Sequence, residues 1–445
     1  MVPHSETTGG MPIDGVEFVG WETSACPPIG WNSEGGPEAS AEVIDELNAV
    51  IGRAVGSGKG TRVAVFPGFF DPHVHLREPG YSSKETIATG TAAAAHGGYT
   101  TVGAMPNLDP VPDSVQSLAV EEDLIGRNAL IRVIPFGALT RGQHGNELAD
   151  IAALAPRVIG FSDDGFGVND DALMRQAFEE VAQAGSIIST HAEVSALRPS
   201  GASINDGTYA HEHGLMGIPT AAEYQQIERD VRLLADLKAS KGIAPRYNVC
   251  HISCRESADA IRRAHALGLD VSAETAPHYL LLDDSMLKDD GRFKMNPPLR
   301  QPSDREAIVR ALADGTITMI ATDHAPHTAE EKSHGLRGSA FGIVGIETAF
   351  PLLYTRLVIP GVISLARLVH LFSAGPRQRF GLRASNRDFT LWQLDGSYTI
   401  DSRTFLSKGK ATPFDGWSVS ARCLATVCDG HIAYHIPDGA GVGAF

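Results

Sequence analysis

Short apolar runs alternate with amphipathic runs along most of this chain, from Arg62 onwards. Eight runs have the composition of buried strands: RVAVFPGFFDPHVH, TTVGAMP, IRVIPFGAL, VIGFSDD, SIISTHAE, RYNVCHIS, VSAETAPHYLLL and TMIATDHAP. Segments such as DALMRQAFEEVAQAG and CRESADAIRRAHALG lie between them, with apolar residues at helical spacing. Alternating strands and helices indicate parallel β/α units, and eight of these units close a barrel. The pattern therefore predicts an α/β protein with a (β/α)8 TIM-type barrel over residues 63–385.

Three of the predicted helices carry a start signal. In each, a serine is followed three residues later by a glutamate, which is the pattern of a capping box. The pairs are Ser82 with Glu85, Ser253 with Glu256 and Ser303 with Glu306. We expect these helices to begin directly after their serines.

Both ends of the chain depart from the alternation. Residues 1–62 are rich in glycine and proline and contain one helix-like run, AEVIDELNAVIGRAVG. After residue 385 strand-like pieces return without matching helices, in DFTLWQL, SYTIDS, GWSVSARCLATVCDG and HIAYHI. We predict that residues 386–445 and the N-terminal segment 1–62 together form a small β-rich appendage to the barrel.

Composition narrows the class of protein. The 445 residues are 43% hydrophobic, which argues against disorder, and the formal charge of −16 disfavours nucleic acid or an anionic membrane as partner. The longest apolar stretch, around residues 349–372, is interrupted by Arg356, Pro360 and Arg367, so it does not predict a membrane span. The start MVPHSETTGG does not resemble a signal peptide, and five cysteines fit a reducing compartment. We expect a soluble cytoplasmic protein.

Polar residues collect at the carboxyl ends of the predicted strands, although buried parallel strands are apolar almost throughout. These residues are His73, His75, Asn107, Asp163, Asp164, His191, His251, His278, Asp323, His324 and His327. Catalytic groups of such barrels lie at this rim. Because side chains two apart on a strand point the same way, His73 and His75 can face one metal. Alone, such a pair is a weak signal, but with imidazole and carboxylate groups at other strand ends it predicts a zinc site.

Two neighbouring features stay open. Cys250 and Cys254 flank His251 and could be read as part of a metal site, but Cys250 should face away from His251 on a strand, which favours buried packing. His278 either supports the rim or makes a hydrogen bond within it. We leave these residues out of the predicted ligand set.

The rim motifs together resemble those of a known family. PGFFDPHVHLREPG, AMPN ending at residue 107, FSDDG, HIS, ETAPHYL, FKMNPPLR, ATDHAPH and FGIVGIETAFPLLY are similar to the dihydroorotases of the amidohydrolase superfamily. Within that family they resemble the bacterial class in which an aspartate on strand four bridges two metals. The likeness runs from about Phe66 to at least Gly416, whereas residues 1–60 resemble the family little.

The resemblance implies a ligand set. His73, His75, Asp164 and Asp323 would surround one Zn²⁺, and Asp164, His191 and His251 a second, with Asp164 and a hydroxide as bridges. Asp163 would be a neighbour that holds the loop. Many related hydantoinases bridge their metals with a carboxylated lysine, but this chain has no lysine between Lys84 and Lys238. An aspartate must therefore bridge the metals, or the site holds one metal.

The resemblance also implies a reaction and a substrate site. The reaction is the reversible cyclisation of N-carbamoyl-L-aspartate to dihydroorotate in pyrimidine synthesis, with Asp323 as the catalytic acid and base. The implied substrate-binding residues are His75, Arg77, Asn107, Asn296, His327, Phe341 and Gly342. Arg77, Asn107 and His327 would clamp the free carboxylate, and the others would line the ring. For Arg77 the alternative is a salt bridge to Glu78 or Glu85, and for Asn296 it is a simple turn.

Two other functions remain as alternatives. One is another cyclic amidase, such as a hydantoinase or an allantoinase, on the same barrel. The other is a catalytically inactive dihydroorotase-like chain that serves as a scaffold for aspartate transcarbamoylase. We expect a homodimer, with aspartate transcarbamoylase as a further partner. The segment from Thr328 to Phe341 is either a mobile cover or an ordinary solvated loop.

Overall fold

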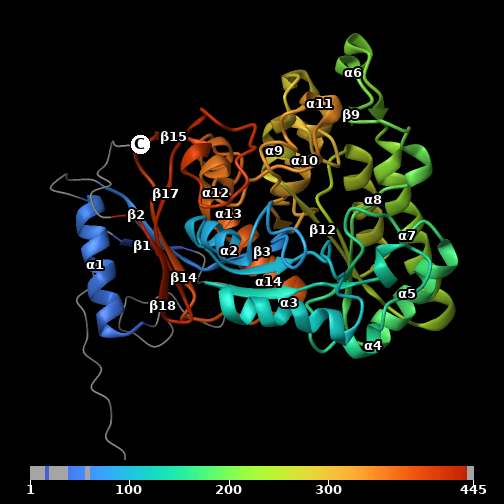
Figure 1. Ribbon diagram of the computed structural model, residues 1–445, viewed down its shortest axis with the longest axis horizontal. Coiled ribbons are helices and arrows are strands. Elements are labelled where there is room, and N and C mark those ends of the chain that lie inside the picture. Colours follow the sequence, from blue (N-terminus) through green and yellow to red (C-terminus); the bar gives the residue numbers. More distant parts are fainter. Residues whose placement is uncertain (1–15, 20–38, 56–60, 438–445) are drawn as a thin grey trace, which may run out of the picture.

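The computed structural model describes residues 16–19, 39–55 and 61–437. Figure 1 shows a barrel wrapped by helices and, beside it, a separate sheet whose outer face is covered by helix α1 (Ala41–Val55). The helix-like run expected within the first 60 residues is therefore confirmed, whereas most of the remaining N-terminal segment lies outside the described residues. No helix of the described part is long and apolar enough to cross a membrane.

Parallel strands form the barrel in the expected order. One group is β3 (Phe69–Val74), β4 (Tyr99–Ala104) and β5 (Arg132–Pro135), and the other is β6 (Gly137–Ala138), β7 (Phe161–Ser162), β8 (Ile187–Thr190), β11 (Arg246–Val249), β12 (Val271–Thr275) and β13 (Met319–Ile320). β5 and β6 are two parts of one predicted strand, separated by Phe136. A parallel bridge between Val74 and His324 joins the last strand to the first. The predicted barrel is confirmed.

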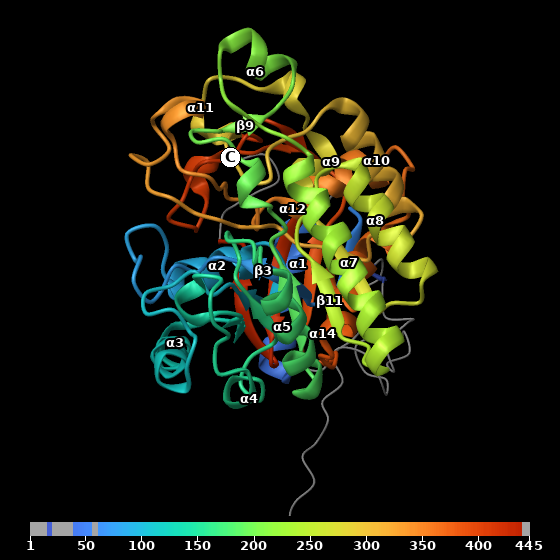
Figure 2. The same ribbon diagram turned by 90° about the vertical axis from the view of Figure 1, so that its right-hand side faces the viewer.

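Helices cover the outside of the barrel, as Figure 2 shows from the side. They are α2 (Ile87–His96), α3 (Val115–Asn128), α4 (Ile151–Leu154), α5 (Asp171–Gln183), α7 (Ala221–Lys241), α8 (Arg255–Ala266), α10 (Pro302–Ala313), α13 (Leu365–Phe372) and α14 (Ala374–Phe380). Several of them turn an apolar stripe inward, as α8 does with Ala258, Ile261 and Ala264.

The starts of three helices differ from the prediction. The N-cap residues are Thr86, Cys254 and Gln301, and of these only Thr86 makes a capping box, with Thr89. Glu85 precedes the N-cap residue, and its buried carboxylate accepts hydrogen bonds both from the backbone N–H of Thr86 and from Ser407 and Lys408. This side chain therefore links the start of α2 to a distant segment of the chain.

Short elements extend the carboxyl ends of the strands and surround the barrel mouth. Between β8 and α7 lie η2 (Ser195–Leu197), β9 (Ile204–Asn205), α6 (Thr208–His213) and β10 (Gly217–Ile218), at the top of Figure 2. After β12 the run predicted as one long strand turns into helix α9 (Pro277–Leu281), because a proline at the first helical position presets the helical φ. Beyond β13 come α11 (Gly335–Gly338) and α12 (Ala349–Leu353).

The terminal segments meet in a five-stranded mixed sheet, as expected for the appendage. Its order is β1 (Val16–Phe18), β2 (Val63–Pro67), β14 (Phe389–Gln393), β17 (Arg422–Cys428) and β18 (His431–His435). β1 and β2 are parallel and the other pairs antiparallel. One face packs on Leu47, Val50 and Ile51 of α1.

The first predicted strand is in fact two strands that belong to different sheets. β2 pairs with β14 in the terminal sheet, and β3 begins the barrel after Gly68. A Cβ at Gly68 would lie 2.3 Å from Oγ1 of Thr100, so only glycine fits between the two sheets. This glycine brings the terminal sheet directly against the barrel strand that carries His73 and His75.

Candidate metal centre and substrate cavity

All six predicted metal ligands come together at the carboxyl end of the barrel. His73 is in β3 and His75 directly follows it, and the other ligands follow β7, β8, β11 and β13. Every one of them is buried: His73, His75, Asp164, His191, His251 and Asp323. Residues from five strands therefore meet in one small volume that water reaches poorly.

The first group of ligand atoms surrounds two carboxylates. Nε2 of His73 lies 3.3 Å from Oδ1 of Asp164 and 3.5 Å from Oδ1 of Asp323. Nε2 of His75 lies 3.4 Å from Oδ2 of Asp164 and 3.3 Å from Oδ1 of Asp323. These are the four residues expected around one zinc.

The second group adjoins the first through Asp164. Nδ1 of His191 lies 3.1 Å from Nε2 of His251, and both nitrogens are 3.7 Å from Oδ1 of Asp164. Asp164 thus stands between the two groups of imidazoles, whereas Asp163 turns away. The Asp163 carboxylate accepts from the backbone N–H groups of Leu139 (2.8 Å) and Thr140 (3.0 Å), so it holds the neighbouring loop.

The donor set fits a divalent cation. Nε2 of His73 and Oδ1 of Asp164 are buried and have no hydrogen-bond partner among the described residues, and such atoms need a partner. Ligand atoms of His73, Asp164 and His251 lie within 4.8 Å of one another, as do those of His73, His75 and Asp323. Imidazole together with carboxylate is the donor chemistry that zinc takes.

Glu274 supports the centre from behind. Its Oε1 lies 2.9 Å from Nδ1 of His73, and its Oε2 accepts from Nδ2 of Asn248 at 3.1 Å. A carboxylate at Nδ1 fixes the imidazole tautomer and leaves the Nε2 lone pair for the metal. Cys250 also approaches His73 and Glu274, but its thiol is buried among Phe70 and other apolar side chains, and burial raises its pKa. This burial agrees with the predicted packing of Cys250, and the same thiol lies within 4.8 Å of ligand atoms of His73 and Glu274.

Both carboxylates of the centre are ionised. Burial by itself raises the pKa of Asp164, but the imidazoles of His73 and His251 outweigh it and hold this pKa well below its usual range. Burial also opposes the charge of Asp323, yet the hydrogen bond with His75 brings its pKa below the ordinary value. The centre therefore presents two negative charges to a cation.

Three residues at the candidate metal centre and its cavity have a strained backbone conformation. Arg77, His251 and Asp323 have φ of 63°, 32° and 48°, in a region that residues other than glycine adopt rarely. All three lie just after barrel strands. Strain of this kind costs free energy and concentrates at functional sites.

A cavity of about 220 Å³ opens onto the centre. It is lined by all seven residues expected to bind substrate, namely His75, Arg77, Asn107, Asn296, His327, Phe341 and Gly342. The lining also includes four of the predicted ligands, Asp164, His191, His251 and Asp323. The cavity therefore brings the expected substrate residues and the metal ligands to one place.

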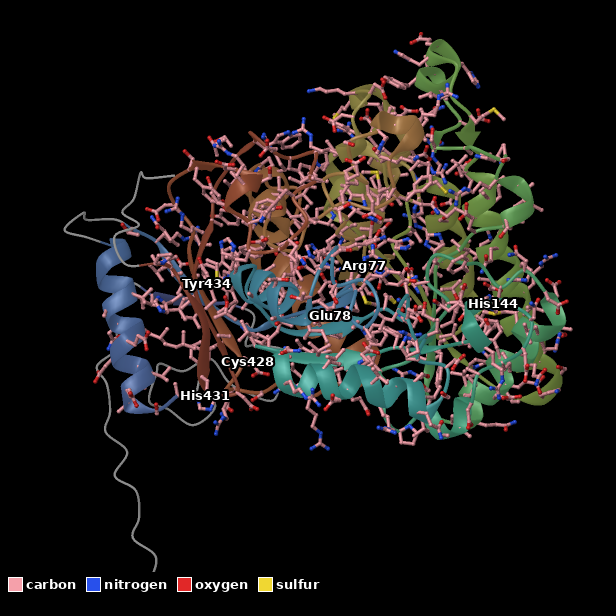
Figure 3. The ribbon with its side chains drawn as sticks, viewed as in Figure 1. Arg77, Glu78, His144, Cys428, His431 and Tyr434 are labelled. Atoms are coloured by element: carbon pink, nitrogen blue, oxygen red, sulfur yellow. The ribbon has the colours of Figure 1, made fainter. Side chains whose placement is uncertain are left out.

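Arg77 faces this cavity and does not form the alternative salt bridge. Its Nη2 lies 3.4 Å from Nε2 of His327, and its Nε donates to the carbonyl of Pro326 at 3.2 Å. Glu78, which Figure 3 labels next to Arg77, instead accepts from the backbone N–H of Ile87. No ion pair joins Arg77 to Glu78 or Glu85 within the described residues.

The other predicted residues have defined partners. Nδ2 of Asn107 donates to the carbonyl of Asp164 at 2.5 Å, and Nδ2 of Asn296 lies 3.0 Å from Oε2 of Glu193 and 3.1 Å from Nε2 of His191. Asn296 thus reaches His191, one of the predicted metal ligands, and does more than form a turn. His278 is buried outside the ligand groups, and burial lowers its pKa to about 4, so its imidazole is neutral.

Sequence reasoning missed three charged residues at this site. Glu274 and Glu193 back the ligands His73 and His191, and Arg198 lines the cavity. The glutamates follow the strand-end pattern and could have been found there. Arg198 lies in an irregular loop, where no periodicity singles out a residue.

Comparisons with known proteins agree with the geometry. The Dihydro-orotase-like family matches residues 62–257. The chain is 47% identical over 382 residues to a dihydroorotase of Shouchella clausii, covering 84% of this chain and 88% of that one. It is 43% identical over 407 residues to a dihydroorotase of a Geobacillus species, covering 90% and 91%. Among solved structures, an L-hydantoinase (dihydropyrimidinase) from Arthrobacter aurescens matches with a TM-score of 0.71 and 25% identity, over 84% of this chain and 85% of that one.

The structural match shows that the barrel and its appended sheet have the amidohydrolase fold. The sequence matches show which family with this fold the chain resembles most. The share of identical residues is far higher with the dihydroorotases than with the hydantoinase, over nearly the whole length of both chains. This chain belongs to the dihydroorotase family of metal-dependent cyclic amidohydrolases.

Proposed function

We propose that this chain catalyses the reversible cyclisation of N-carbamoyl-L-aspartate to dihydroorotate. The observation that carries this proposal is one cavity that joins the guanidinium of Arg77 to a buried cluster of imidazoles and carboxylates. Dihydroorotate carries a free carboxylate beside a cyclic amide, so a cation and a hydrolytic centre in the same cavity suit it.

His73, His75, Asp164 and Asp323 would hold one zinc ion, and Asp164, His191 and His251 a second. A divalent metal bound by these residues supplies Lewis acidity, which activates water and polarises a carbonyl group. Oδ1 of Asp164, which lies within reach of imidazoles from both groups, supports its role as the bridge.

Asp323 would carry the proton. It lines the cavity and is ionised, so in ring opening it accepts a proton from the attacking water. It then donates this proton to the ring nitrogen as the carbon–nitrogen bond breaks. In ring closure it takes the proton from the ureido nitrogen and returns it to the departing oxygen, which leaves the carboxyl carbon as water with one further proton from solution.

Arg77, Asn107 and His327 would clamp the free carboxylate. A planar guanidinium matches the two oxygens of a carboxylate. Burial and the positive charges of Arg77 and Lys84 lower the pKa of His327 to about 3, so its imidazole is a neutral hydrogen-bonding group. Neutral dihydropyrimidines and hydantoins have no carboxylate for this clamp.

The rival cyclic amidase is tested by parallel assays. Metal-loaded protein is incubated with dihydroorotate, hydantoin, allantoin and dihydrouracil, and its metal content is measured on the same sample. We expect opening of dihydroorotate alone. Faster opening of hydantoin or allantoin would contradict the proposal, and a metal-loaded sample without any activity would favour the inactive scaffold.

The assembly and the compartment are further proposals. The family resemblance supports a homodimer that associates with aspartate transcarbamoylase, and light scattering with and without that enzyme tests both. Cys250, Cys254, Cys423 and Cys428 are free thiols, which fits the cytoplasm.

A further inference from the structure

The segment from Thr328 to Gly342 contains one buried charged side chain, Lys332, which is 8% exposed. The last two residues of the segment, Phe341 and Gly342, line the cavity, whereas Lys332 is not among the lining residues. A lysine is almost never buried to this degree unless its ammonium has partners. The partners of Lys332 therefore bear on how this part of the cavity wall is built.

All three N–H groups of the Lys332 ammonium are used by backbone carbonyl groups. Nζ lies 2.7 Å from the carbonyl oxygen of Ala340, 2.6 Å from that of Gly342 and 3.1 Å from that of Lys294. An ammonium has three donors and no acceptor, so these contacts satisfy it completely. One side chain thus joins the end of its own segment to a second segment, which contains Lys294.

Both joined segments reach the cavity. Lys294 is two residues before Asn296, which lines the cavity as Gly342 does. The carbonyl oxygen of Lys294 also accepts from the backbone N–H of Gly342 at 3.1 Å. The ammonium of Lys332 and the amide of Gly342 therefore meet at one oxygen atom. This contact fixes the position of Gly342 relative to Asn296.

The wall of the cavity at Gly342 consists of backbone. Gly342 has φ of 127°, and a Cβ there would lie 2.8 Å from both Cβ and the carbonyl oxygen of Ala325, so glycine is required. Because no side chain stands between this backbone and a ligand, a shift of the backbone changes directly what a ligand meets.

The charge of the ammonium matters for these contacts. Burial and the positive charge of Lys294 lower the pKa of Lys332 to about 7, against the opposing charges of Asp290 and Glu331. His327 also faces this group, but its pKa of about 3 keeps it neutral near pH 7. A neutral amine has two N–H groups and a lone pair, so it cannot donate to three carbonyl oxygens.

We propose that the ammonium of Lys332 positions the Phe341–Gly342 wall of the cavity for the substrate. This inference rests on the proposed function, in which Phe341 and Gly342 line the ring of dihydroorotate. Lys332 is a positioning residue, because it acts through the backbone of Gly342 and does not touch the substrate. The segment from Thr328 to Gly342 is then a held wall of the cavity and not a mobile cover.

Steady-state kinetics at pH 6 tests the proposal first. Methionine resembles lysine in length and has no N–H donor, so Lys332→Met removes the three contacts with little change of shape. We expect the KM values for dihydroorotate and N-carbamoyl-L-aspartate to rise about fivefold, within the range of one neutral hydrogen bond, and kcat to change less than twofold. Zinc content should stay unchanged. A loss confined to KM is the sign of a binding wall out of place.

The pH profile separates this role from a merely structural one. The KM of Lys332→Met divided by that of wild type should be greatest at pH 6 and fall toward one by pH 8.5. The reason is that the wild-type side chain loses its third N–H group as the pH rises through about 7. Both proteins contain Lys294 and the metal ligands, so the titrations of those groups affect both KM values.

Hydrogen exchange gives a readout that does not depend on activity. In Lys332→Met the backbone amides of residues 328–342 should exchange faster, while those of α5 should exchange as in wild type. Lys238→Met is the matched control, because Nζ of Lys238 also donates to two backbone carbonyl groups, those of Leu267 and Gly268, away from the cavity. It should change neither KM nor the exchange of residues 328–342.

A second variant keeps the test open if the methionine variant does not fold. Lys332→Gln retains two N–H donors without a charge, so its KM should rise less, and its ratio to wild type should fall with pH in the same way. In a folded variant, unchanged KM values at pH 6, a KM ratio that does not vary with pH, or unchanged exchange of residues 328–342 would each overturn the inference. Wild-type protein that interconverts neither compound would overturn the proposed function, whereas the exchange experiment would still show whether Lys332 holds this segment.

Discussion

Glu274 reaches the metal centre only through His73. Its carboxylate lies 2.9 Å from Nδ1 of His73 and is buried together with Asn248, whose amide holds it. The imidazole that it orients is the one residue shared by every cluster of candidate metal ligands in the described part of the chain.

Replacing Glu274 should therefore weaken the metal site without removing a ligand. In Glu274→Gln we expect zinc affinity to fall about 10- to 100-fold, because the tautomer of His73 is no longer fixed by a carboxylate. Competition with a chromogenic chelator measures this affinity directly. Glu121→Gln is a suitable control, since Glu121 is equally buried but lies in α3. Equal affinities in both variants would contradict the prediction.

A second prediction at the residue scale concerns the guanidinium of Arg77. Arg77→Lys keeps the charge but loses the planar fork. We expect the KM for dihydroorotate to rise about tenfold to a hundredfold, the range of charge-assisted hydrogen bonds, with zinc content unchanged. Kinetics together with metal analysis checks both parts. Unaltered kinetics would remove Arg77 from the carboxylate clamp.

At the scale of single elements, one helix contains a buried carboxylate that lies outside the candidate site. Asp230, in α7, is fully buried and accepts from Nε of Arg229 and the hydroxyl of Tyr247, each at 2.7 Å. Burial raises the pKa of its carboxyl from 3.8 to about 6, and these partners compensate only in part. The folded state therefore binds a proton at Asp230 more readily than the unfolded state does.

The sign of the resulting pH dependence follows from that raised pKa. The ionised carboxylate destabilises the fold above pH 6, and the penalty disappears as the pH falls from 6 to 3.8. Relative to Asp230→Asn, the wild type should gain up to about 3 kcal/mol over this window, at about 1.4 kcal/mol for each unit. Urea unfolding of both proteins at pH 7, 5.5 and 4 tests this, and a difference that does not vary with pH would refute it.

The contact between the two sheets depends on one glycine. Gly68→Ala places a Cβ 2.3 Å from Oγ1 of Thr100, in a packed interior that cannot yield freely. We expect a loss of about 1–3 kcal/mol of unfolding free energy, as for other overpacked sites. Gly126→Ala is the opposite control: nothing lies within 4 Å of its Cβ and it is in helix α3, so it should stabilise the protein slightly. Thermal unfolding compares the two variants.

At the scale of the whole molecule, the predicted metal ligands come from strands all around the barrel. These residues lie in or directly after strands β3, β7, β8, β11 and β13, so a bound cation would link strands from different sides of the barrel. The buried carboxylates of Asp164 and Asp323 repel each other when no cation balances them.

Removal of metal should therefore destabilise the entire barrel. A ligand that binds only the folded state adds RT ln(1 + [L]/Kd), about 4 kcal/mol at a thousandfold excess over Kd. We expect the thermal midpoint to fall after treatment with a chelator and to return when zinc is added back. A midpoint that does not respond to either treatment would contradict a metal bound at this centre.

Much of the site could be predicted because its signals are local. His73 and His75 share a face since strand side chains alternate, and the carboxyl ends of parallel strands meet at one rim. A carboxylated lysine as the bridge is excluded by the sequence alone, because no lysine lies between Lys84 and Lys238. Other local signals failed, as at Ser82 and Glu85, because the helix begins after Thr86 and Glu85 also binds Ser407 and Lys408.

The sequence by itself determined the strand order, the barrel and the rim of polar residues at its carboxyl end, because each depends on residue type and short-range periodicity. The choice of ligands among those residues came from the resemblance of the motifs to a family. Only the tertiary structure decided which side chains support them. Glu274 reaches His73 across 201 residues of chain, and Asn296 reaches Glu193 across 103. Arg198 gains its place from a loop without periodicity, which only packing against Glu193 and Phe341 fixes. Contacts between distant segments depend on the closed shape of the barrel, and no local pattern encodes that shape.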